Sequence, residues 1–307
     1  MGRGRHLEPP PEPAMELSGE AAAWLDRLAA GEVPPSVALM HLAAGAPGPE
    51  AVEAALAAAA GPADAEARGR LAAARDLWRA NPQAWGIVRE VLGGVDHGEE
   101  LEGARAVAAL AAAFDRAARA SPEGSVALYA LGSPALLRAA TEEIVAALDA
   151  WGLLSREARL VDLGCGIGRV AAALAPRVAA VTGLDIAPAM IAAARERCAG
   201  LANVALHLGS GRDLAPVPTG GADLVLAVDS FPYLVQAGLA ADHVREAARV
   251  LRPGGDLVVL NYSYRGDLAR DRREAAALAA SHGFRLIRAG TAPFTTWDGR
   301  AFQLRRL

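Results

Sequence analysis

The sequence predicts an α/β protein, with a mostly parallel, helix-wrapped sheet in its second half and an all-helical N-terminal domain in its first half. Three observations support this prediction. At 307 residues the chain is longer than a single hydrophobic core usually serves. Alanine-rich segments with helical spacing fill the first part, whereas short apolar runs alternate with helical segments after Trp151. Strands that alternate with helices at this spacing form a parallel sheet with helices on both faces.

The first element is a proline-rich stretch, residues 1–14, which predicts a disordered leader. Prolines stand where a signal peptide would need an apolar segment, and no apolar run is long enough to span a membrane. Cys165 and Cys198 lack the spacing of a disulfide framework or a zinc site. We therefore expect a cytoplasmic protein with no membrane partner and no bound metal.

Residues 15–120 form the predicted helical domain. Glycine and proline interrupt its helical pattern at several places and predict about five short helices. The interruptions fall at 31–35, 45–49, 61–62, 81–82 and 93–94. We expect this domain to act as a lid, a substrate selector or a dimer surface, which leaves a homodimer through it as one arrangement.

The α/β domain is predicted over residues 121–307. Ser133 and Pro134 are typical of a helix start, because serine caps free amide hydrogens and proline suits the first helical position. The expected strands are 159–163, 179–185, 204–208, 222–229 and 257–262, and the expected helices are 134–151, 170–174, 188–199, 240–251 and a last one to about 282. The segments 284–289 and 301–306 are joined by a short connection and should pair as antiparallel strands.

A glycine-rich turn follows the first of these strands and contains Gly164, Gly166 and Gly168. Glycine permits unusual backbone dihedrals and lets a ligand approach the backbone closely. The helix that follows offers unpaired amide hydrogens to a polar or negative group. Nucleotide-binding folds of several kinds use such a turn, so the turn alone does not identify the ligand.

Asp185 ends the next predicted strand, 21 residues after Gly164. In dinucleotide-binding folds a carboxylate at about this offset accepts hydrogen bonds from the ribose hydroxyls. The alternative role is a surface helix cap ahead of Pro188. Because the glycine turn and the carboxylate occur together in the correct order, the sequence favours the ribose role.

The spacing of the glycines separates two cofactors. The nicotinamide fingerprint needs glycine at its first, third and sixth positions, but Arg169 holds the sixth position here. With Asp162 before the turn, this segment resembles the first motif of class I S-adenosylmethionine-dependent methyltransferases. Residues 185–190 resemble the second motif of that family, and residues 251–255 resemble the turn before its fifth strand. The resemblance covers about 133–307 and implies a Rossmann-like, seven-stranded sheet with an antiparallel C-terminal hairpin.

The resemblance also implies a binding site for the cofactor S-adenosyl-L-methionine. The three glycines would cradle its methionine part, and Asp162 would support the loop or bind the amino group. Asp185 would hold the ribose, and Ile186 would pack on the adenine. After its third strand the family often places an acidic residue near the adenine amine, where Ser210 stands here. The adenine contact would then pass to Ser210, to the backbone at Gly211 or to Asp213.

Two residues near the end of the fourth strand are candidates for lining the reaction centre, Asp229 and Tyr233. The position beside the bound methyl group makes Asp229 a candidate for contact with the cofactor as well. Residues 230–233 resemble the Asn-Pro-Pro-Tyr motif of amino-group methyltransferases only faintly, so no amine substrate is inferred. Plain packing explains Tyr233 equally well.

The sequence therefore predicts an S-adenosylmethionine-dependent methyltransferase for a small-molecule acceptor. The net charge of −4, and arginines in 265–273 that alternate with aspartates, indicate no nucleic-acid partner. The alternatives are a protein or RNA acceptor, a catalytically silent protein that binds the cofactor, and a nicotinamide-dependent dehydrogenase, which Arg169 disfavours. Methyl transfer needs a general base only if the acceptor must lose a proton, so no histidine is required.

Overall fold

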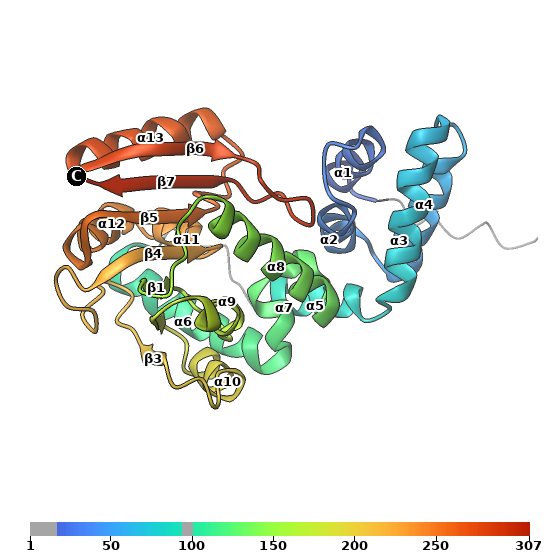
Figure 1. Ribbon diagram of the computed structural model, residues 1–307. Coiled ribbons are helices and arrows are strands. Elements are labelled where there is room, and N and C mark those ends of the chain that lie inside the picture. Colours follow the sequence, from blue (N-terminus) through green and yellow to red (C-terminus); the bar gives the residue numbers. More distant parts are fainter. Residues whose placement is uncertain (1–16, 94–100) are drawn as a thin grey trace, which may run out of the picture. The chain divides into compact units, whose positions relative to one another are not determined.

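A computed structural model describes residues 17–93 and 101–307. The predicted leader, residues 1–14, lies outside the described residues. Contacts between Cα atoms divide the chain into two compact units, Met1–Trp85 and Gly86–Leu307. Each unit is described by itself below (Figure 1).

The first unit is helical, as the sequence predicts. Its helices are α1 (Gly19–Ala30), α2 (Pro35–Gly45), α3 (Pro49–Ala60) and α4 (Ala65–Ala80). Ser18 and Asp64 cap two of them, because their side chains accept hydrogen bonds from the amides of Ala21 and Ala67. Leucines and alanines on the inner faces are buried and hold the four helices together.

More helices precede the sheet in the second unit. They are α5 (Ala84–Gly93), which crosses the division, α6 (Gly103–Ala120), α7 (Pro122–Val126), the 3₁₀ turn Leu128–Ala130 and α8 (Pro134–Ala150). Helix α6 packs along α10 (Pro188–Arg197) of the α/β fold, so the contacts place it with the second unit. An end of the helical domain at residue 120 stays a prediction. Ser133 precedes α8, but its side chain makes no capping hydrogen bond. The predicted start of the helix was therefore right, and the predicted cap by the serine hydroxyl was wrong.

Seven strands of the described chain form one sheet in the order β3-β2-β1-β4-β5-β7-β6. Neighbours from β3 to β5 pair in parallel, and β7 pairs antiparallel with both β5 and β6. The strands are β1 (Arg159–Leu163), β2 (Ala180–Asp185), β3 (Val204–Leu208), β4 (Ala222–Val228), β5 (Leu251–Leu260), β6 (Phe284–Thr291) and β7 (Ala301–Arg306). This arrangement confirms the predicted fold class, a parallel sheet that ends in an antiparallel hairpin.

The fifth strand begins earlier than the predicted residue 257. Leu251 already pairs with Ala222, and the register then shifts before Asp256 pairs with Leu224. Residues 253–255 are therefore an irregularity within β5, whereas the sequence pattern predicted a turn before the strand.

Helices cover the sheet between the strands. They are α9 (Arg169–Leu174), the 3₁₀ turn Ala175–Arg177, α10 (Pro188–Arg197), α11 (Phe231–Gln236), α12 (Ala240–Val250) and α13 (Leu268–Ser281). Short α11 was not predicted, since six residues give little periodicity to read.

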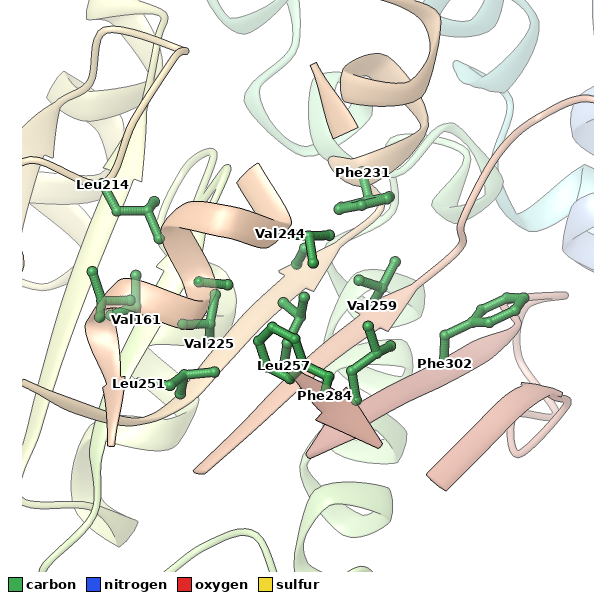
Figure 2. Packing of buried hydrophobic residues seen from close by; sticks show 14 of the residues in the cluster. Val161, Leu214, Val225, Phe231, Val244, Leu251, Leu257, Val259, Phe284 and Phe302 are labelled. Atoms are coloured by element: carbon green, nitrogen blue, oxygen red, sulfur yellow. The ribbon is translucent and has the colours of Figure 1, made fainter. Parts of the chain in front are cut away.

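A large buried cluster lies on the face of the sheet that α12 and α13 cover. Figure 2 shows Val225, Leu257, Val259 and Phe302 of neighbouring strands side by side, with Val244 of α12 packed on them. These side chains are almost inaccessible to solvent, and their burial stabilises this unit through the hydrophobic effect. A rigid sheet results, and it fixes the positions of the loops that leave the ends of its strands.

Candidate functional site

The candidate site lies at the carboxyl ends of the parallel strands. Since parallel strands all end at the same edge, the loops after β1, β2, β4 and β5 meet there. In open α/β sheets ligands bind at this edge, next to the point where the strand order reverses, here between β1 and β4. The structure thus brings the glycine turn, Asp185 and Asp229 to one edge.

The glycine turn has a backbone that other residues rarely adopt. Gly164, Gly166 and Gly168 have φ of +73°, +52° and +73°, in the left-handed region. A Cβ on Gly164 would lie 2.4 Å from the Cβ of Ser230, and one on Gly166 would lie 2.6 Å from a methyl of Val126. Glycine is therefore required at these positions by conformation and by space.

Asp185 connects the end of β2 to the glycine turn. One carboxylate oxygen accepts a hydrogen bond from the amide of Gly166, and the other accepts one from the amide of Ala187, both at 2.9 Å. Each oxygen keeps a lone pair for a further donor. Burial raises the pKa of this carboxyl, although the two amides lower it. The residue thus orders the turn, a role that the sequence did not reveal, while its contact with ribose stays a prediction.

Asp162 lies in β1 and is 1% exposed. Its Oδ2 is buried and has no hydrogen-bond partner. Burial raises the pKa of this carboxyl to about 7, although the charge of Arg169 lowers it. A buried carboxylate oxygen without a donor is costly unless a ligand supplies one. An ammonium group beside the turn would meet this need, so the site fits the amino group of the predicted cofactor.

The residues predicted to contact adenine follow β2 and β3. Ser210 donates a hydrogen bond to Asp213 at 3.0 Å and accepts one from the amide of Arg212, so its hydroxyl is engaged in a local turn. Gly211 has φ +70°, and a Cβ on it would lie 2.7 Å from Val107 of α6 and 3.0 Å from Ile186. Ile186 and Gly211 are therefore brought together under α6, and their contact with adenine stays a prediction.

Asp229 follows β4 in an unusual conformation, with φ +58°. Its Oδ1 accepts hydrogen bonds from the Nδ2 of Asn261 and the hydroxyl of Tyr264, both at 2.9 Å. Burial raises the pKa of its carboxyl, and the two donors lower it. A left-handed aspartate is strained, and such residues cluster at functional sites.

An aromatic cluster borders Asp229. Tyr233 of α11 packs edge-to-face against Tyr264 at 5.6 Å and against Phe114 of α6 at 5.0 Å, measured between ring centroids. Tyr264 is 57% exposed. Asn261, Tyr264 and Phe114 were not predicted as site residues. The sequence did hold a signal for Asn261 and Tyr264. Both residues follow the fifth strand, just as Asp229 follows the fourth strand.

A second aromatic group joins the segment before α8 to the loop between β6 and β7. Tyr129 stacks on Trp297, which stacks on Phe294, with centroid distances of 5.2 and 4.7 Å. The loop between β6 and β7 that carries the last two is bound to α8 by Glu143. That carboxylate accepts hydrogen bonds from the amides and hydroxyls of Thr295 and Thr296.

We expect Glu143→Gln to lower the free energy of unfolding by about 1–2 kcal/mol at pH 7, since an amide replaces one of the two acceptor oxygens with a donor. Burial raises the pKa of Glu143, but the threonine donors bring it below its usual value. The stability that Glu143 contributes is therefore fully present above the pKa that it has in the unfolded chain. This stability is lost as the pH falls through the pKa that Glu143 has in the folded protein. Urea unfolding at pH 7 and pH 3 checks this, with Glu142→Gln as control. An equal decrease in the free energy of unfolding in Glu143→Gln and Glu142→Gln would contradict the prediction.

Comparisons with known proteins agree with this geometry. Residues 160–255 match the family model described as a methyltransferase domain. A demethylmenaquinone methyltransferase of Tropheryma whipplei (strain Twist) is 39% identical over 107 residues, which cover 34% of this chain and 42% of the relative. A ubiquinone biosynthesis O-methyltransferase of Xanthomonas oryzae pv. oryzae (strain PXO99A) is 33% identical over 101 residues, covering 33% and 41%. The matches thus span less than half the length of these relatives.

The matched segment contains the glycine turn, Asp185 and the strands β1 to β4, in the order that the resemblance implies. This part of the chain is a class I S-adenosylmethionine-dependent methyltransferase domain. A solved structure of phosphoethanolamine N-methyltransferase 1 from Haemonchus contortus aligns with the chain at a TM-score of 0.51 and 16% identity, covering 66% of this chain and 49% of that one. At this identity the alignment shows a shared fold.

Two further observations concern the chain around the methyltransferase domain. Across residues 17–93 and 101–307, none of the helices is both long and apolar enough to cross a membrane. In the same ranges no three side chains of His, Cys, Asp or Glu come together as metal ligands.

Proposed function

We propose that the protein transfers a methyl group from S-adenosylmethionine to a small-molecule acceptor. The observation that carries the proposal is the contact between the amide of Gly166 and the carboxylate of Asp185, 2.9 Å apart, at the switch point of a methyltransferase domain. It places a glycine turn and a carboxylate where one ligand can touch both.

The residues that would hold the cofactor follow from the geometry. The three glycines give the turn its left-handed backbone, Asp162 offers a buried acceptor to an ammonium group, and Asp185 offers its free lone pairs to ribose hydroxyls. When bound, the cofactor supplies a methyl group that its sulfonium already activates. The protein therefore has to align the acceptor in line and exclude water.

The acceptor side of the proposed site is the surface around Asp229. Tyr233 and Tyr264 present aromatic faces, and the Asp229 carboxylate lies beside them with two donors on its Oδ1. A flat ring that carries a hydroxyl fits this combination, since the ring can pack on tyrosine and the carboxylate can orient or accept the proton. Three matching relatives bear the names of quinone or hydroquinone compounds, which supports small aromatic acceptors.

Isothermal titration of the protein with S-adenosylmethionine, S-adenosylhomocysteine and NAD tests the cofactor first. We expect saturable binding of the first two and none of NAD. A folded protein that binds neither sulfur compound would overturn the proposal, and binding of NAD alone would favour the dehydrogenase. Incubation with methyl-labelled cofactor and a panel of hydroquinones and phenols then tests transfer. Label found in protein or RNA instead would identify a macromolecular acceptor, and binding without transfer to any acceptor would indicate a silent binding protein.

With an acceptor from that panel, we expect Tyr264→Phe to lower kcat about 3- to 10-fold, because Asp229 loses one of its two side-chain donors. Loss of that donor raises the pKa of Asp229, so the acidic limb of the pH–rate profile should move to higher pH. Tyr262→Phe is the matched control, since Tyr262 makes no hydrogen bond to Asp229. An unchanged profile in Tyr264→Phe would show that this hydroxyl does not act through Asp229.

A further inference from the structure

The loop between β6 and β7 carries Trp297, to which the proposed function assigns no role. Trp297 is 1% exposed, and its Nε1 is a buried donor with no hydrogen-bond partner among residues 17–93 and 101–307. An indole has this one N–H donor and no acceptor atom. A donor left unpaired in the protein interior costs free energy, so each such group needs an explanation. An acceptor for this N–H would have to come from a molecule that binds to the protein.

The protein holds the Trp297 ring in one orientation. Tyr129 and Phe294 stack on the ring, with the centroid distances given above. A Cβ on Gly299 would lie 2.5–2.6 Å from three atoms of the six-membered ring of the indole, so the backbone also packs closely against that part. The next residue, Asp298, is exposed, so the indole lies one residue beneath the surface. Packing thus engages the apolar parts of the indole, and the N–H is the part that remains for a ligand.

Two anchors fasten this loop, and one of them reaches Asp229. At residues 295–296 the loop is bound by Glu143 of α8. At its other end the amide of Arg300 donates to Oδ1 of Asn261 at 3.0 Å, and the carbonyl of Arg300 accepts from the amide of Asn261 at 2.8 Å. The Nδ2 of Asn261 in turn donates to Asp229. The loop that carries the indole is therefore fixed to the acceptor side of the proposed site.

The charges near the indole decide which kind of oxygen fits. Burial raises the pKa of the Tyr129 phenol, on which the indole stacks, to about 12. Three charges also lie near enough to act on this phenol, those of Arg169, Asp229 and Asp298. With one cation against two carboxylates, an anionic oxygen would be repelled on balance, whereas a neutral oxygen would not. A carbonyl or ether oxygen is therefore favoured over a carboxylate or a phenolate.

We propose that the indole N–H of Trp297 donates a hydrogen bond to a neutral oxygen of the methyl acceptor, separate from the oxygen that receives the methyl group. The inference rests on the proposed function and narrows its acceptor to an aromatic ring with a second oxygen substituent. Asp229 suits an O–H group that loses its proton, whereas an N–H donor occupies a lone pair and weakens a nucleophile. One oxygen therefore serves both groups poorly, and two oxygens on one ring serve them well.

Calorimetry with matched ring compounds, in the presence of saturating S-adenosylhomocysteine, tests this proposal. The three hydroxyacetophenone isomers carry a hydroxyl and a neutral carbonyl, and each corresponding ethylphenol has a methylene in place of the carbonyl. At about pH 6 the phenols stay protonated. We expect the wild type to bind one hydroxyacetophenone at least about 10-fold more tightly than its ethylphenol. In Trp297→Phe this preference should fall below about 3-fold, and the affinities for the ethylphenol and for S-adenosylhomocysteine should each change less than about 3-fold.

Two variants serve as controls. Trp151→Phe removes an indole at the end of α8 that lies under the guanidinium of Arg288, and it should keep the full preference for the carbonyl compound. Phe294→Leu loosens the stack but keeps the indole N–H, so it should weaken both compounds of a pair by a similar factor. Loss of affinity for both compounds by the same factor in Trp297→Phe would show that Trp297 acts by packing alone, and the inference would be wrong.

The wild type alone can also overturn the inference. Equal affinities within all three pairs would mean that the N–H meets no ligand oxygen, and tighter binding of hydroxybenzoates than of hydroxyacetophenones would contradict a neutral oxygen. Binding of S-adenosylhomocysteine without binding of any ring compound would refute this inference alone, whereas absence of S-adenosylhomocysteine binding would refute the proposed function.

If Trp297→Phe does not fold, NMR of the wild type gives the same test. The chain has five tryptophans, and the indole signal of Trp297 is the one that persists when each of the other four is replaced by phenylalanine. We expect this N–H signal to move downfield with the hydroxyacetophenone and not with the ethylphenol, because only the former has an acceptor for it. A signal that responds equally to both compounds would count against the hydrogen bond.

Discussion

Replacing Asp185 with alanine should weaken the binding of S-adenosylhomocysteine by at least about 100-fold. Two effects combine in this variant. A carboxylate that accepts hydrogen bonds from two ribose hydroxyls contributes about 1.5–3 kcal/mol for each, and about 1.4 kcal/mol is a factor of ten in affinity. The same carboxylate accepts the hydrogen bond from Gly166, so its loss also disorders the turn. Isothermal titration measures the change.

Two further variants separate these effects. Asp185→Asn keeps one acceptor oxygen, so its affinity for S-adenosylhomocysteine should lie between those of the wild type and Asp185→Ala. Asp149→Ala removes an exposed carboxylate that pairs with Arg177, and it should change the affinity less than about 3-fold. If Asp185→Ala bound as tightly as the wild type while folding normally, the carboxylate would have no part in the ligand site.

Replacing Asp162 with asparagine should stabilise the second unit at pH 8 while weakening the binding of S-adenosylhomocysteine. Burial raises the pKa of this carboxyl to about 7, so the folded protein holds a proton that the unfolded chain releases at lower pH. Stability from this group is therefore greatest at low pH, falls as pH rises above the unfolded pKa, and is lost above about pH 7. Because each pKa unit is worth about 1.4 kcal/mol, the ionised form costs up to about 4 kcal/mol.

Hydrogen exchange of amides in β1 and β4 measures the opening free energy of the unit that contains Asp162, separately from the first unit. We expect the gain in Asp162→Asn to be roughly 2–3 kcal/mol at pH 8 and to shrink toward pH 4, since asparagine does not ionise. Asp149→Asn, at an exposed position, is the control. A gain that did not depend on pH would show that the carboxyl of Asp162 is not the group responsible. A stable variant that binds poorly would mark Asp162 as a residue kept for function at a cost in stability.

The strands and the glycine turn were readable from the sequence because both depend on local pattern. Alternation of apolar runs and helices predicts the sheet. Gly164, Gly166 and Gly168 predict a turn with unusual backbone dihedrals, and in the structure all three have positive φ. The antiparallel pairing of β6 with β7 followed from the short connection between them. Local rules failed at Ser133, whose hydroxyl does not cap α8, and at the irregular start of β5.

Other site residues depend on contacts between distant segments, which a single sequence does not show. Phe114 reaches Tyr233 only because α6 packs beside α11. Arg169 meets Tyr129 and Thr141 only because the segment before β1 folds back on α9. Ser210 shows the opposite case, because its place after the third strand was read correctly while its hydroxyl bonds to Asp213 within the turn. The sequence thus predicted where Ser210 lies relative to the strands, but it did not predict the hydrogen-bond partners of Ser210 or of Arg169.

The strand order also has a consequence for synthesis. Strand β6 leaves the ribosome before β7, yet it reaches the sheet only through β7, which lies between β5 and β6. Until Ala301–Arg306 emerge, β5 remains an open edge, and the buried face of β6 with Phe284 has no partner strand. Open edges template pairing with other chains. Translation that stalls between residues 291 and 301 would therefore leave a nascent chain with a nearly complete sheet that is prone to aggregate and visible to chaperones.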